Sequence, residues 1–361
     1  MAELEWGGEL IGAWNGAGWI DLAVTAGRKI ARLIGAEPGE VLVADSTSVN
    51  LFKLLAAALE LRPGRRVILC QDNHFPTDLY IAEGVAALRG APFEVRRAPP
   101  AELAASLSNE VAVLCCSQVD FRSGELLDMT ALNAAARRHG ALSCWDLSHS
   151  AGALPVELNA AGCDLAVGCG YKFLNGGPGA PAFLFVRQEL QEVIRNPLPG
   201  WLGHREPFAF SPHYQPASGI ERFTCGTPPI LALAALDAAL SAFAELDLGE
   251  LRRKSLALGD YFRQLLEARC PDCGFEILTP PEPERRGSQI SLRHPEAFAL
   301  VQALISEGVV PDFRAPDLLR FGLTPLYQRF ADVLRAVETL RALLLTGRHR
   351  EARFQQRSKV T

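Results

Sequence analysis

From residue 40 onward, the chain alternates short apolar runs with longer Ala- and Leu-rich segments of helical periodicity. Runs that are apolar at every position predict strands buried on both faces, and the segments between them predict helices that cover a sheet. The predicted strands are 40–45, 65–70, 93–98, 111–116, 141–147, 164–169 and 182–186. The predicted helices among them are 49–60, 79–88, 101–107 and 128–139. This order indicates an α/β fold with a mostly parallel central sheet.

The pattern changes after the last of these strands. Residues 196–229 are rich in Pro, Gly and aromatic residues and have no periodicity, which is typical of a functional or interface loop. A long helical stretch follows and ends at Ala268. The remaining predicted elements are strands at 275–280 and 288–293 and a helix at 328–345. They indicate a smaller α+β domain whose boundary lies near residue 240.

Length and composition refine this division. We expect a large α/β domain over 1–240, a small C-terminal domain over 241–347 and a basic tail over 348–361. Apolar residues make up 48% of the chain and charged residues 21%, which excludes a disordered protein. The formal net charge of −5 gives no electrostatic basis for nucleic-acid binding. The tail is locally basic, and most such tails are solvated and frayed.

Targeting signals and cysteines bear on the compartment. The start MAELEWGGEL has no basic region followed by an apolar run, and no apolar stretch is long enough to span a bilayer, so a cytoplasmic protein is expected. Nine cysteines, an odd number in apolar surroundings, indicate a reducing compartment rather than a disulfide framework. Cys270 and Cys273 form a CxxC pair, but no second pair follows them. We therefore predict no metal site and no redox pair there.

Three features of the predicted sheet point to one kind of chemistry. Asp146 stands at the end of one buried strand with His149 three residues later, and Lys172 follows another buried strand. Pyridoxal phosphate needs a lysine for its covalent attachment and a carboxylate that keeps its ring nitrogen protonated. Hydroxyls and amides at 46–48, between a strand and a helix, offer a phosphate cradle. An ion pair between Asp146 and Lys172 and a simple helix cap are the alternatives, but the three together favour the cofactor.

The sequence also resembles a known family over residues 5–330. The stretches that carry the resemblance are DSTSVNLFK (45–53), NHFPTDLYIAEG (73–84), WDLSHSAGALPVEL (145–158), GCGYKFLNGGPGAPAFLFV (168–186), GWLGH (200–204) and FTCGTPPI (223–230). They are similar to kynureninase, a fold-type-I pyridoxal-phosphate enzyme of the class V aminotransferase group. The chain lacks a match to the catalytic-cysteine loop of the related cysteine desulfurases. The resemblance to kynureninase implies a homodimeric hydrolase that uses pyridoxal phosphate.

The resemblance implies a role for each matching residue. Lys172 carries the cofactor covalently, Asp78 and Asp146 lie near the ring nitrogen, and Phe75 stacks on the ring. Tyr171 contacts the phosphate and exchanges protons during the reaction. The other cofactor contacts are Thr47, Ser48, Ser117, His149, Trp201 and Thr227.

The same resemblance implies the substrate. Kynureninases hydrolyse L-kynurenine to anthranilate and L-alanine, and 3-hydroxykynurenine to 3-hydroxyanthranilate, in tryptophan catabolism and NAD biosynthesis. Arg320 matches the arginine that binds the substrate carboxylate, and Trp14 and Thr227 match positions that border the substrate ring. Trp201 and Thr227 match positions that reach in from the neighbouring subunit. Because an indole offers an apolar face and one N–H donor, we expect L-kynurenine to be preferred over its 3-hydroxy form.

Several alternatives stay open at this point. Phe75 could pack in the core, Trp201 could anchor a loop, and the Tyr171 hydroxyl could satisfy a backbone group. Arg320 could pair with Asp312 or Asp317 on the surface. The chain opens directly on the family's EWG motif, without a segment resembling YLDGNSLG. A cofactor-binding protein with little activity, or another class V enzyme such as a cysteine desulfurase or aminotransferase, therefore remains an alternative.

Overall fold

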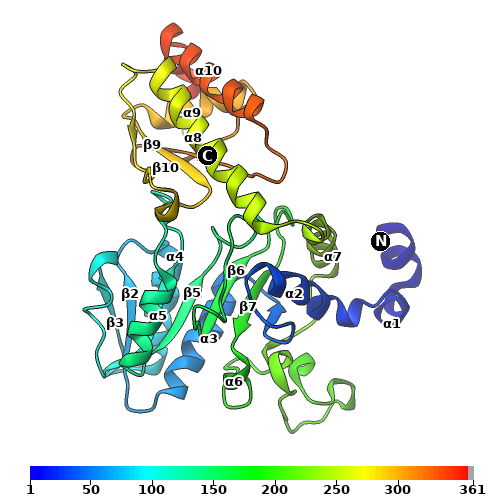
Figure 1. Ribbon diagram of the computed structural model, residues 1–361. Helices are drawn as coiled ribbons and strands as arrows, with labels where there is room; N and C mark the ends of the chain where they lie inside the picture. Colours follow the sequence, from blue (N-terminus) through cyan, green and yellow to red (C-terminus); the bar gives the residue numbers. More distant parts are fainter. Residues whose placement is uncertain (357–361) are drawn as a thin grey trace. The chain divides into compact units, whose positions relative to one another are not determined.

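A seven-stranded sheet forms the centre of the larger of two units in the computed structural model, which describes residues 1–356 (Figure 1). Its strands are β1 (Val41–Val43), β2 (Val67–Gln71), β3 (Glu94–Ala98), β4 (Val111–Ser117), β5 (Leu142–Asp146), β6 (Leu165–Cys169) and β7 (Ala182–Val186). The spatial order is β1-β7-β6-β5-β4-β2-β3, and only β7 runs against its neighbours. The mostly parallel sheet predicted from the apolar runs is confirmed.

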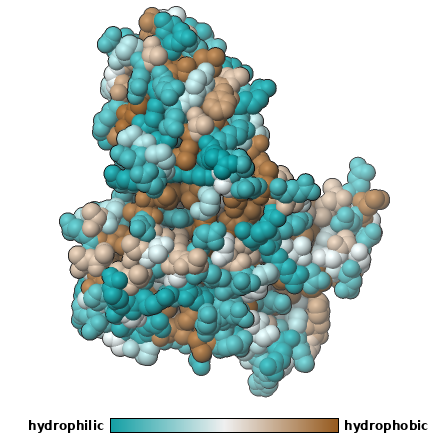
Figure 2. Space-filling model, viewed as in Figure 1, coloured by the Kyte–Doolittle hydropathy of each residue, from teal (hydrophilic) through white to brown (hydrophobic). Residues whose placement is uncertain are grey.

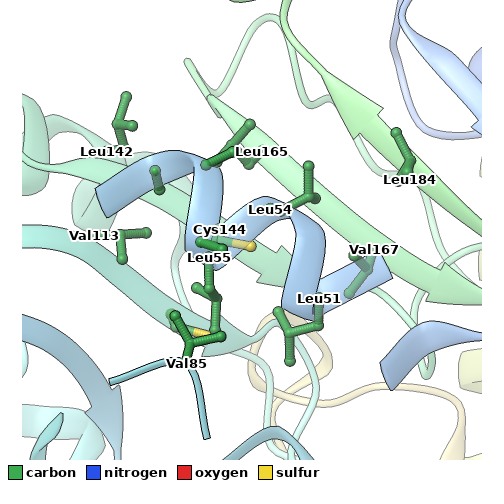
Figure 3. Close-up of a cluster of buried hydrophobic side chains, with 14 of the residues drawn as sticks. Leu51, Leu54, Leu55, Val85, Val113, Leu142, Cys144, Leu165, Val167 and Leu184 are labelled. Carbon is green, nitrogen blue, oxygen red and sulfur yellow. The ribbon is translucent and has the colours of Figure 1, made fainter. Parts of the chain in front are cut away.

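Helices cover this sheet through apolar faces. The main ones are α2 (Leu22–Leu33), α3 (Thr47–Leu61), α4 (Pro76–Arg89), α5 (Met129–Arg138) and α7 (Ile230–Leu240). Helix α3 packs against β4 to β7, and α4 packs against β2, β3 and α3. Figure 3 shows Leu51, Leu54 and Leu55 of α3 in one cluster with sheet residues Val113, Leu142, Leu165 and Val167. The spacing of these leucines places them on one helix face, which explains why the core forms there.

One predicted helix is wrong. Residues 101–107 form no α-helix; a 3₁₀ turn, η4 (Pro100–Glu102), is followed by irregular turns. A seven-residue segment cannot offset the cost of helix nucleation without strong packing. Ser108 follows at once, and its hydroxyl accepts from the Glu110 amide at 3.3 Å, in a local turn that competes with a helix.

The second unit contains Val119–Leu126 and the chain from Asp247 onward. Its elements are α8 (Leu248–Arg269), β8 (Glu276–Ile277), β9 (Gln289–Arg293), α9 (Ala297–Ser306), β10 (Asp312–Arg314), β11 (Leu318–Gly322) and α10 (Phe330–Thr346). The four strands form an antiparallel sheet in the order β10-β11-β9-β8. The sequence pattern predicted α8, α10 and the strands β8 and β9, but not α9 or the β10–β11 hairpin.

The expectation of a frayed basic tail is wrong for the part of the tail that the structure describes. His349 is 1% exposed and Phe354 is 5% exposed, and Phe354 packs into the core of the second unit. Arg350 donates to both carboxylate oxygens of Glu296, at 2.8 and 3.0 Å. One imidazole and one benzene ring thus anchor a segment that its charge alone would leave in solvent. Arg357 and Lys359 lie outside the described residues.

Short helical segments complete the described chain. They are η1 (Ala2–Glu9), η2 (Leu10–Gly12), α1 (Ala13–Gly16), η3 (Trp19–Asp21), α6 (Gln188–Gln191), η5 (Trp201–Gly203), η6 (Pro207–Ala209), η7 (Gly219–Phe223), η8 (Ser241–Phe243), η9 (Pro283–Arg285), η10 (Arg348–Arg350) and η11 (Ala352–Phe354). Across residues 1–356, no helix has the length and apolarity needed to cross a bilayer. Figure 2 shows hydrophilic and apolar residues interspersed over the visible face.

The cysteines are thiols, and most of them are core residues. All nine are free, and Cys115 and Cys116 are 1% and 0% exposed. Burial and the nearby Cys273 thiol raise the pKa of Cys270 to about 12. A thiol with such a pKa stays protonated at neutral pH and is a poor nucleophile.

Candidate active site

Several side chains converge at the carboxyl edge of the large sheet. Strands β2, β4, β5 and β6 are parallel, and β1 runs in the same direction because β7 is antiparallel to both of its neighbours. Ser117 ends β4 and Asp146 ends β5, where the two residues are register partners. Lys172 follows β6. Parallel sheets bind ligands at this edge.

The turn that carries Lys172 is fixed by close backbone packing. A Cβ atom at Gly170 would lie 2.4 Å from the carbonyl oxygen of Pro181, so only glycine allows this approach. The Asn175 amide donates to the Lys172 carbonyl at 3.0 Å, and the Gly176 amide donates to Gly170 at 2.9 Å. Lys172 Nζ then lies 3.0 Å from His149 Nε2. The lysine amine is thus held at the sheet edge by its own loop and by a neighbouring imidazole.

Two buried carboxylates lie at this edge, and the surrounding groups balance their negative charge only in part. Asp146 is 8% exposed, and its Oδ1 accepts from the Ser148 amide at 2.8 Å. Burial, followed by the charge of Asp78, raises the pKa of Asp146 to about 6, while Lys172 opposes the shift. Asp78, on the first turn of α4, is 3% exposed. Two such carboxylates favour a cation beside them.

Asp78 has an oxygen that its surroundings do not satisfy. Its Oδ2 is buried and has no hydrogen bond within the described residues, although His74 Nδ1 lies 3.0 Å away. The Phe75 amide donates to the same His74 nitrogen at 3.0 Å, so that nitrogen offers Asp78 no proton. A protonated ring nitrogen would supply what this oxygen lacks. The two carboxylates therefore fit the protonated pyridine ring of pyridoxal phosphate.

A helix N-terminus offers the site for a phosphate group. Ser46 is the N-cap of α3, and its hydroxyl accepts from the Val49 amide at 3.3 Å. Thr47 and Ser48 occupy the first turn, where N–H groups have no acceptor within the helix. Both residues are half-buried. Ser46 is thus a helix cap, as the alternative interpretation had it, and the two residues after it present hydroxyls and amides suited to an anion.

Sequence reasoning missed the lysine behind this helix start. Lys53 is 0% exposed, and its ammonium lies 2.5 Å from Asp45 Oδ2 and donates to the Phe223 carbonyl at 2.8 Å. Asp45 has a φ of 47°, which is rare for a residue with a side chain. The ion pair therefore fixes the turn before Ser46. The signal in the sequence was a lysine on the leucine-bearing face of a predicted helix.

The remaining residues at the edge are Phe75, Ser117 and Tyr171. Phe75 is 39% exposed at the start of α4, so its ring is not a core residue. Ser117 is 6% exposed, and its Oγ lies 3.5 Å from His74 Nδ1. Tyr171 is 50% exposed. Partial burial, together with Cys169 and Asp146, raises the pKa of Tyr171 to about 12, so the phenol keeps its proton at neutral pH.

Trp14, Trp201 and Thr227 lie elsewhere in the same unit. Trp14 and Trp201 line a cavity of about 450 Å³, and Thr227 lines another of about 740 Å³. The two cavities share Ile20 and Phe208. Neither lining includes Lys172 or a strand-end residue from β2, β4, β5 or β6.

Arg320 belongs to the second unit, where it is paired. Its Nε donates to Asp312 Oδ1 at 2.6 Å, its Nη2 donates to Asp312 Oδ2, and its Nη1 donates to the Phe121 carbonyl. The side chain is 7% exposed. Of the two partners that the sequence left open, Asp312 is the one observed, and Asp317 instead lies 3.4 Å from Arg293. The pair is buried on the arginine side rather than exposed on the surface.

Comparison with known proteins agrees with this geometry. Residues 251–340 match the family model described as the kynureninase C-terminal domain. The chain is 48% identical to kynureninase from Pseudomonas fluorescens and 49% identical to that from Burkholderia pseudomallei (strain 1106a), in each case over 99% of this chain and 87% of the relative.

Solved structures share the fold at low sequence identity. An apo cysteine desulfurase from Thermococcus onnurineus NA1 has a TM-score of 0.77 at 17% identity, covering 91% of this chain and 85% of that one. An alanine–glyoxylate aminotransferase from Nostoc sp. has a TM-score of 0.68 at 18% identity, covering 91% and 88%. These structures support the fold alone, whereas the close relatives decide the family. The chain belongs to the kynureninase family.

Proposed function

We propose that this chain hydrolyses L-kynurenine to anthranilate and L-alanine with pyridoxal phosphate as its cofactor. The observation that carries the proposal is the identity of 48–49% to kynureninases over 99% of the chain. The lysine and both buried carboxylates at the sheet edge agree with it. The resemblance to cysteine desulfurases is restricted to the fold, at 17% identity for one of them.

The residues at the edge have complementary tasks. When bound, pyridoxal phosphate supplies an electron sink for negative charge that develops on the substrate. Asp146 and Asp78 hold the positive charge of the ring nitrogen, and Thr47 and Ser48 bind the phosphate. Lys172 holds the cofactor covalently and then removes the Cα proton of the substrate. His149, 3.0 Å from Nζ, orients the lysine amine.

Tyr171 is the proton donor in this proposal. Water adds to the ketone of the kynurenine side chain, and the Cβ–Cγ bond then breaks, which leaves negative charge on Cβ of the alanine fragment. A phenol with a pKa of about 12 is protonated at neutral pH and can donate to that carbon. The residue as a whole is 50% exposed.

The finer assignments rest on the resemblance. Arg320 binds the α-carboxylate of the substrate, because a planar guanidinium suits a carboxylate. Trp14 and Thr227 border the substrate ring. Trp201 and Thr227 serve the neighbouring subunit of a homodimer.

The test is an assay of the purified chain with pyridoxal phosphate and L-kynurenine, following anthranilate fluorescence. Anthranilate and L-alanine should form in equal amounts, and a Lys172→Met variant should form them at least about 10³-fold more slowly. L-cysteine with a thiol reductant serves as a second substrate, and formation of L-alanine and sulfide without any anthranilate from L-kynurenine would assign a desulfurase instead. Cofactor binding without any anthranilate would assign a cofactor-binding protein of little activity.

A further inference from the structure

Lys53 is a buried charge that the proposed chemistry does not use. It lies in the second turn of α3, among buried leucines and alanines of the same helix, and it is 0% exposed. A buried ammonium loses its hydration, so it is stable only beside close acceptors. A leucine at this position would continue the apolar run without that desolvation. Packing alone therefore does not explain the lysine.

One side chain and one backbone carbonyl hold the Lys53 ammonium. Its Nζ lies 2.5 Å from Asp45 Oδ2 and donates to the Phe223 carbonyl at 2.8 Å. Helical side chains point toward the N-terminus of their helix, which brings this Nζ back to the residue before the N-cap Ser46. The ammonium thus joins the start of α3 to the end of η7, and both belong to the larger unit.

Asp45 is held in an unusual backbone conformation. Its φ of 47° lies in the left-handed region. The Asp45 carbonyl accepts from the Ala182 amide at 2.9 Å, and the Ala44 amide donates to the Ala182 carbonyl at 2.9 Å. Strand β7 therefore fixes the backbone of this turn, and Lys53 fixes its side chain. Such conformations persist where the surroundings enforce them, and they are frequent at ligand sites.

The charge of Asp45 would oppose a phosphate group at this turn. Ser46 follows Asp45, and the next two residues, Thr47 and Ser48, present hydroxyls and amides at the helix start. The Asp45 side chain is 32% exposed, so burial does not shield its charge. A carboxylate beside the helix start repels an anion, whereas the amides there attract it. An ion pair with Lys53 ties the turn more strongly than a neutral hydrogen bond would, and it has no net charge.

We propose that Lys53 is a positioning residue for the phosphate group of the cofactor. It fixes the turn at Asp45 and neutralises the carboxylate there, so that Thr47 and Ser48 meet the phosphate without an opposing charge. The proposal rests on the proposed function, which takes Thr47 and Ser48 as the residues that bind the phosphate. Lys53 acts through Asp45 and the turn, and it takes no part in the reaction itself.

The test compares cofactors with and without the phosphate. The variants are Lys53→Met, Asp45→Asn and the double variant, because methionine fills the space of a lysine stem and asparagine accepts a left-handed backbone. Lys29→Met is the matched control, since Lys29 pairs with Asp237 and joins α2 to α7 in the same unit. Pyridoxal phosphate and pyridoxal are titrated into each cofactor-free protein, and the absorbance of the bound cofactor reports both dissociation constants.

Lys53→Met should weaken pyridoxal phosphate binding roughly tenfold, which is the size of effect expected from one uncompensated like charge near a protein surface. Pyridoxal binding should change less than about twofold, because pyridoxal lacks the phosphate that Asp45 repels. The double variant should recover most of the loss, since the carboxylate charge is removed together with the ammonium. Asp45→Asn alone leaves the ammonium in excess, so the affinity for pyridoxal phosphate relative to pyridoxal should rise by about twofold. Lys29→Met should match the unmodified protein.

Three results would overturn the proposal. Equal weakening of both ligands by Lys53→Met would show that Lys53 only maintains the fold, and unchanged binding would show that it does not serve the phosphate. A double variant that binds no better than Lys53→Met would show that the Asp45 charge is irrelevant. If Lys53→Met fails to fold, Asp45→Asn decides, because a relative affinity for pyridoxal phosphate that does not rise contradicts the neutralising role. A protein that gives the expected binding but forms no anthranilate from L-kynurenine would contradict the proposed function and leave this inference standing.

Discussion

The two units differ in how they balance the charge of a carboxylate: two are buried in the large unit, and the one on the hairpin has a side chain that is 38% exposed. At the edge of the large sheet, Asp78 and Asp146 are 3% and 8% exposed. Within residues 1–356, Asp78 has one oxygen without a hydrogen bond, and burial raises the pKa of Asp146 to about 6. On the β10–β11 hairpin, both oxygens of Asp312 accept from guanidinium groups. An incompletely compensated carboxylate indicates that a ligand supplies the missing charge, whereas a compensated one orients its partners.

The largest loss of activity should follow from replacing Lys172 at the edge of the large sheet. Lys172→Met should lower kcat at least about 10³-fold, because both covalent attachment and proton removal are lost. Borohydride treatment of the unmodified holoprotein should add the cofactor mass to the peptide that contains Lys172. Lys254→Met is the control, since Lys254 belongs to the second unit and donates to the Pro325 carbonyl there. Labelling of another lysine would contradict the assignment.

The next effect should come from the phenol beside that lysine. Tyr171→Phe keeps the ring but removes the proton donor, so kcat should fall by about 10²- to 10³-fold with little change in KM. The pKa of about 12 predicts that kcat of the unmodified protein shows no loss from Tyr171 ionisation up to about pH 10. A fall in kcat below pH 9 that Tyr171→Phe abolishes would contradict this.

Asp146→Asn tests the charge imbalance itself. Its raised pKa makes the ionised carboxyl unfavourable in the folded state, so its contribution to stability is most favourable below about pH 4 and is lost as pH rises through about 6. In the cofactor-free protein at pH 7.5, the Asp146→Asn variant should therefore be more stable than the unmodified protein by up to about 3 kcal/mol. This figure takes about 1.4 kcal/mol for each unit of pKa shift. This gain in stability should vanish near pH 4. At pH 7.5 the variant should bind the cofactor more weakly than the unmodified protein.

Thermal unfolding of the cofactor-free protein at both pH values measures this effect. Asp164→Asn is the matched control, because Asp164 Oδ2 accepts from the Ser143 amide at 3.0 Å. An asparagine at this position should not stabilise the fold. A melting temperature that falls in Asp146→Asn at pH 7.5 would show that the carboxylate is already compensated.

The compensated hairpin predicts a different signature. Arg320→Ala should raise KM for L-kynurenine by about 10- to 100-fold, since charge-assisted hydrogen bonds contribute about 1.5–3 kcal/mol. Cofactor affinity should stay constant, and Asp312 keeps Arg314 as its partner at 3.2 Å. An unchanged KM would show that another residue holds the carboxylate.

The smallest effect concerns the aromatic cavities. L-kynurenine should be favoured over 3-hydroxykynurenine by about tenfold in kcat/KM, because apolar pockets reject an added hydroxyl only weakly. Trp14→His should narrow this ratio, since an imidazole can hydrogen-bond the added group. A clear advantage for the hydroxylated substrate in the unmodified protein would overturn the assignment of Trp14 to the substrate ring.

Local signals in the sequence accounted for the large sheet and its edge. Apolar runs predicted β4 and β5, and the rule that parallel strands end at one edge brought Asp146 and Lys172 together. The second unit depends on less local information. Strand β10 is only three residues long and reads Asp-Phe-Arg, so no apolar run announced it.

Long-range pairing explains what the sequence could not supply. Asp312 and Asp317 both lie within eight residues of Arg320, and only the register of the hairpin selects Asp312. Lys53 was not singled out because lysine is rarely fully buried, and its partner Phe223 ends η7, 170 residues further along the chain. Phe121 follows the large sheet in sequence yet contacts Arg320, and no local pattern encodes that contact.

The segment Val119–Leu126 has a consequence for how this chain is made. Because it belongs to the second unit, the polypeptide passes from one unit to the other three times. As the ribosome releases the chain, this segment must wait for partners such as Arg285, whose carbonyl accepts from the Leu126 amide. A gene fragment that begins at Asp247 would lack the Phe121 carbonyl that holds Arg320. Split-gene complementation should therefore fail at the 246/247 junction unless both fragments are synthesised together.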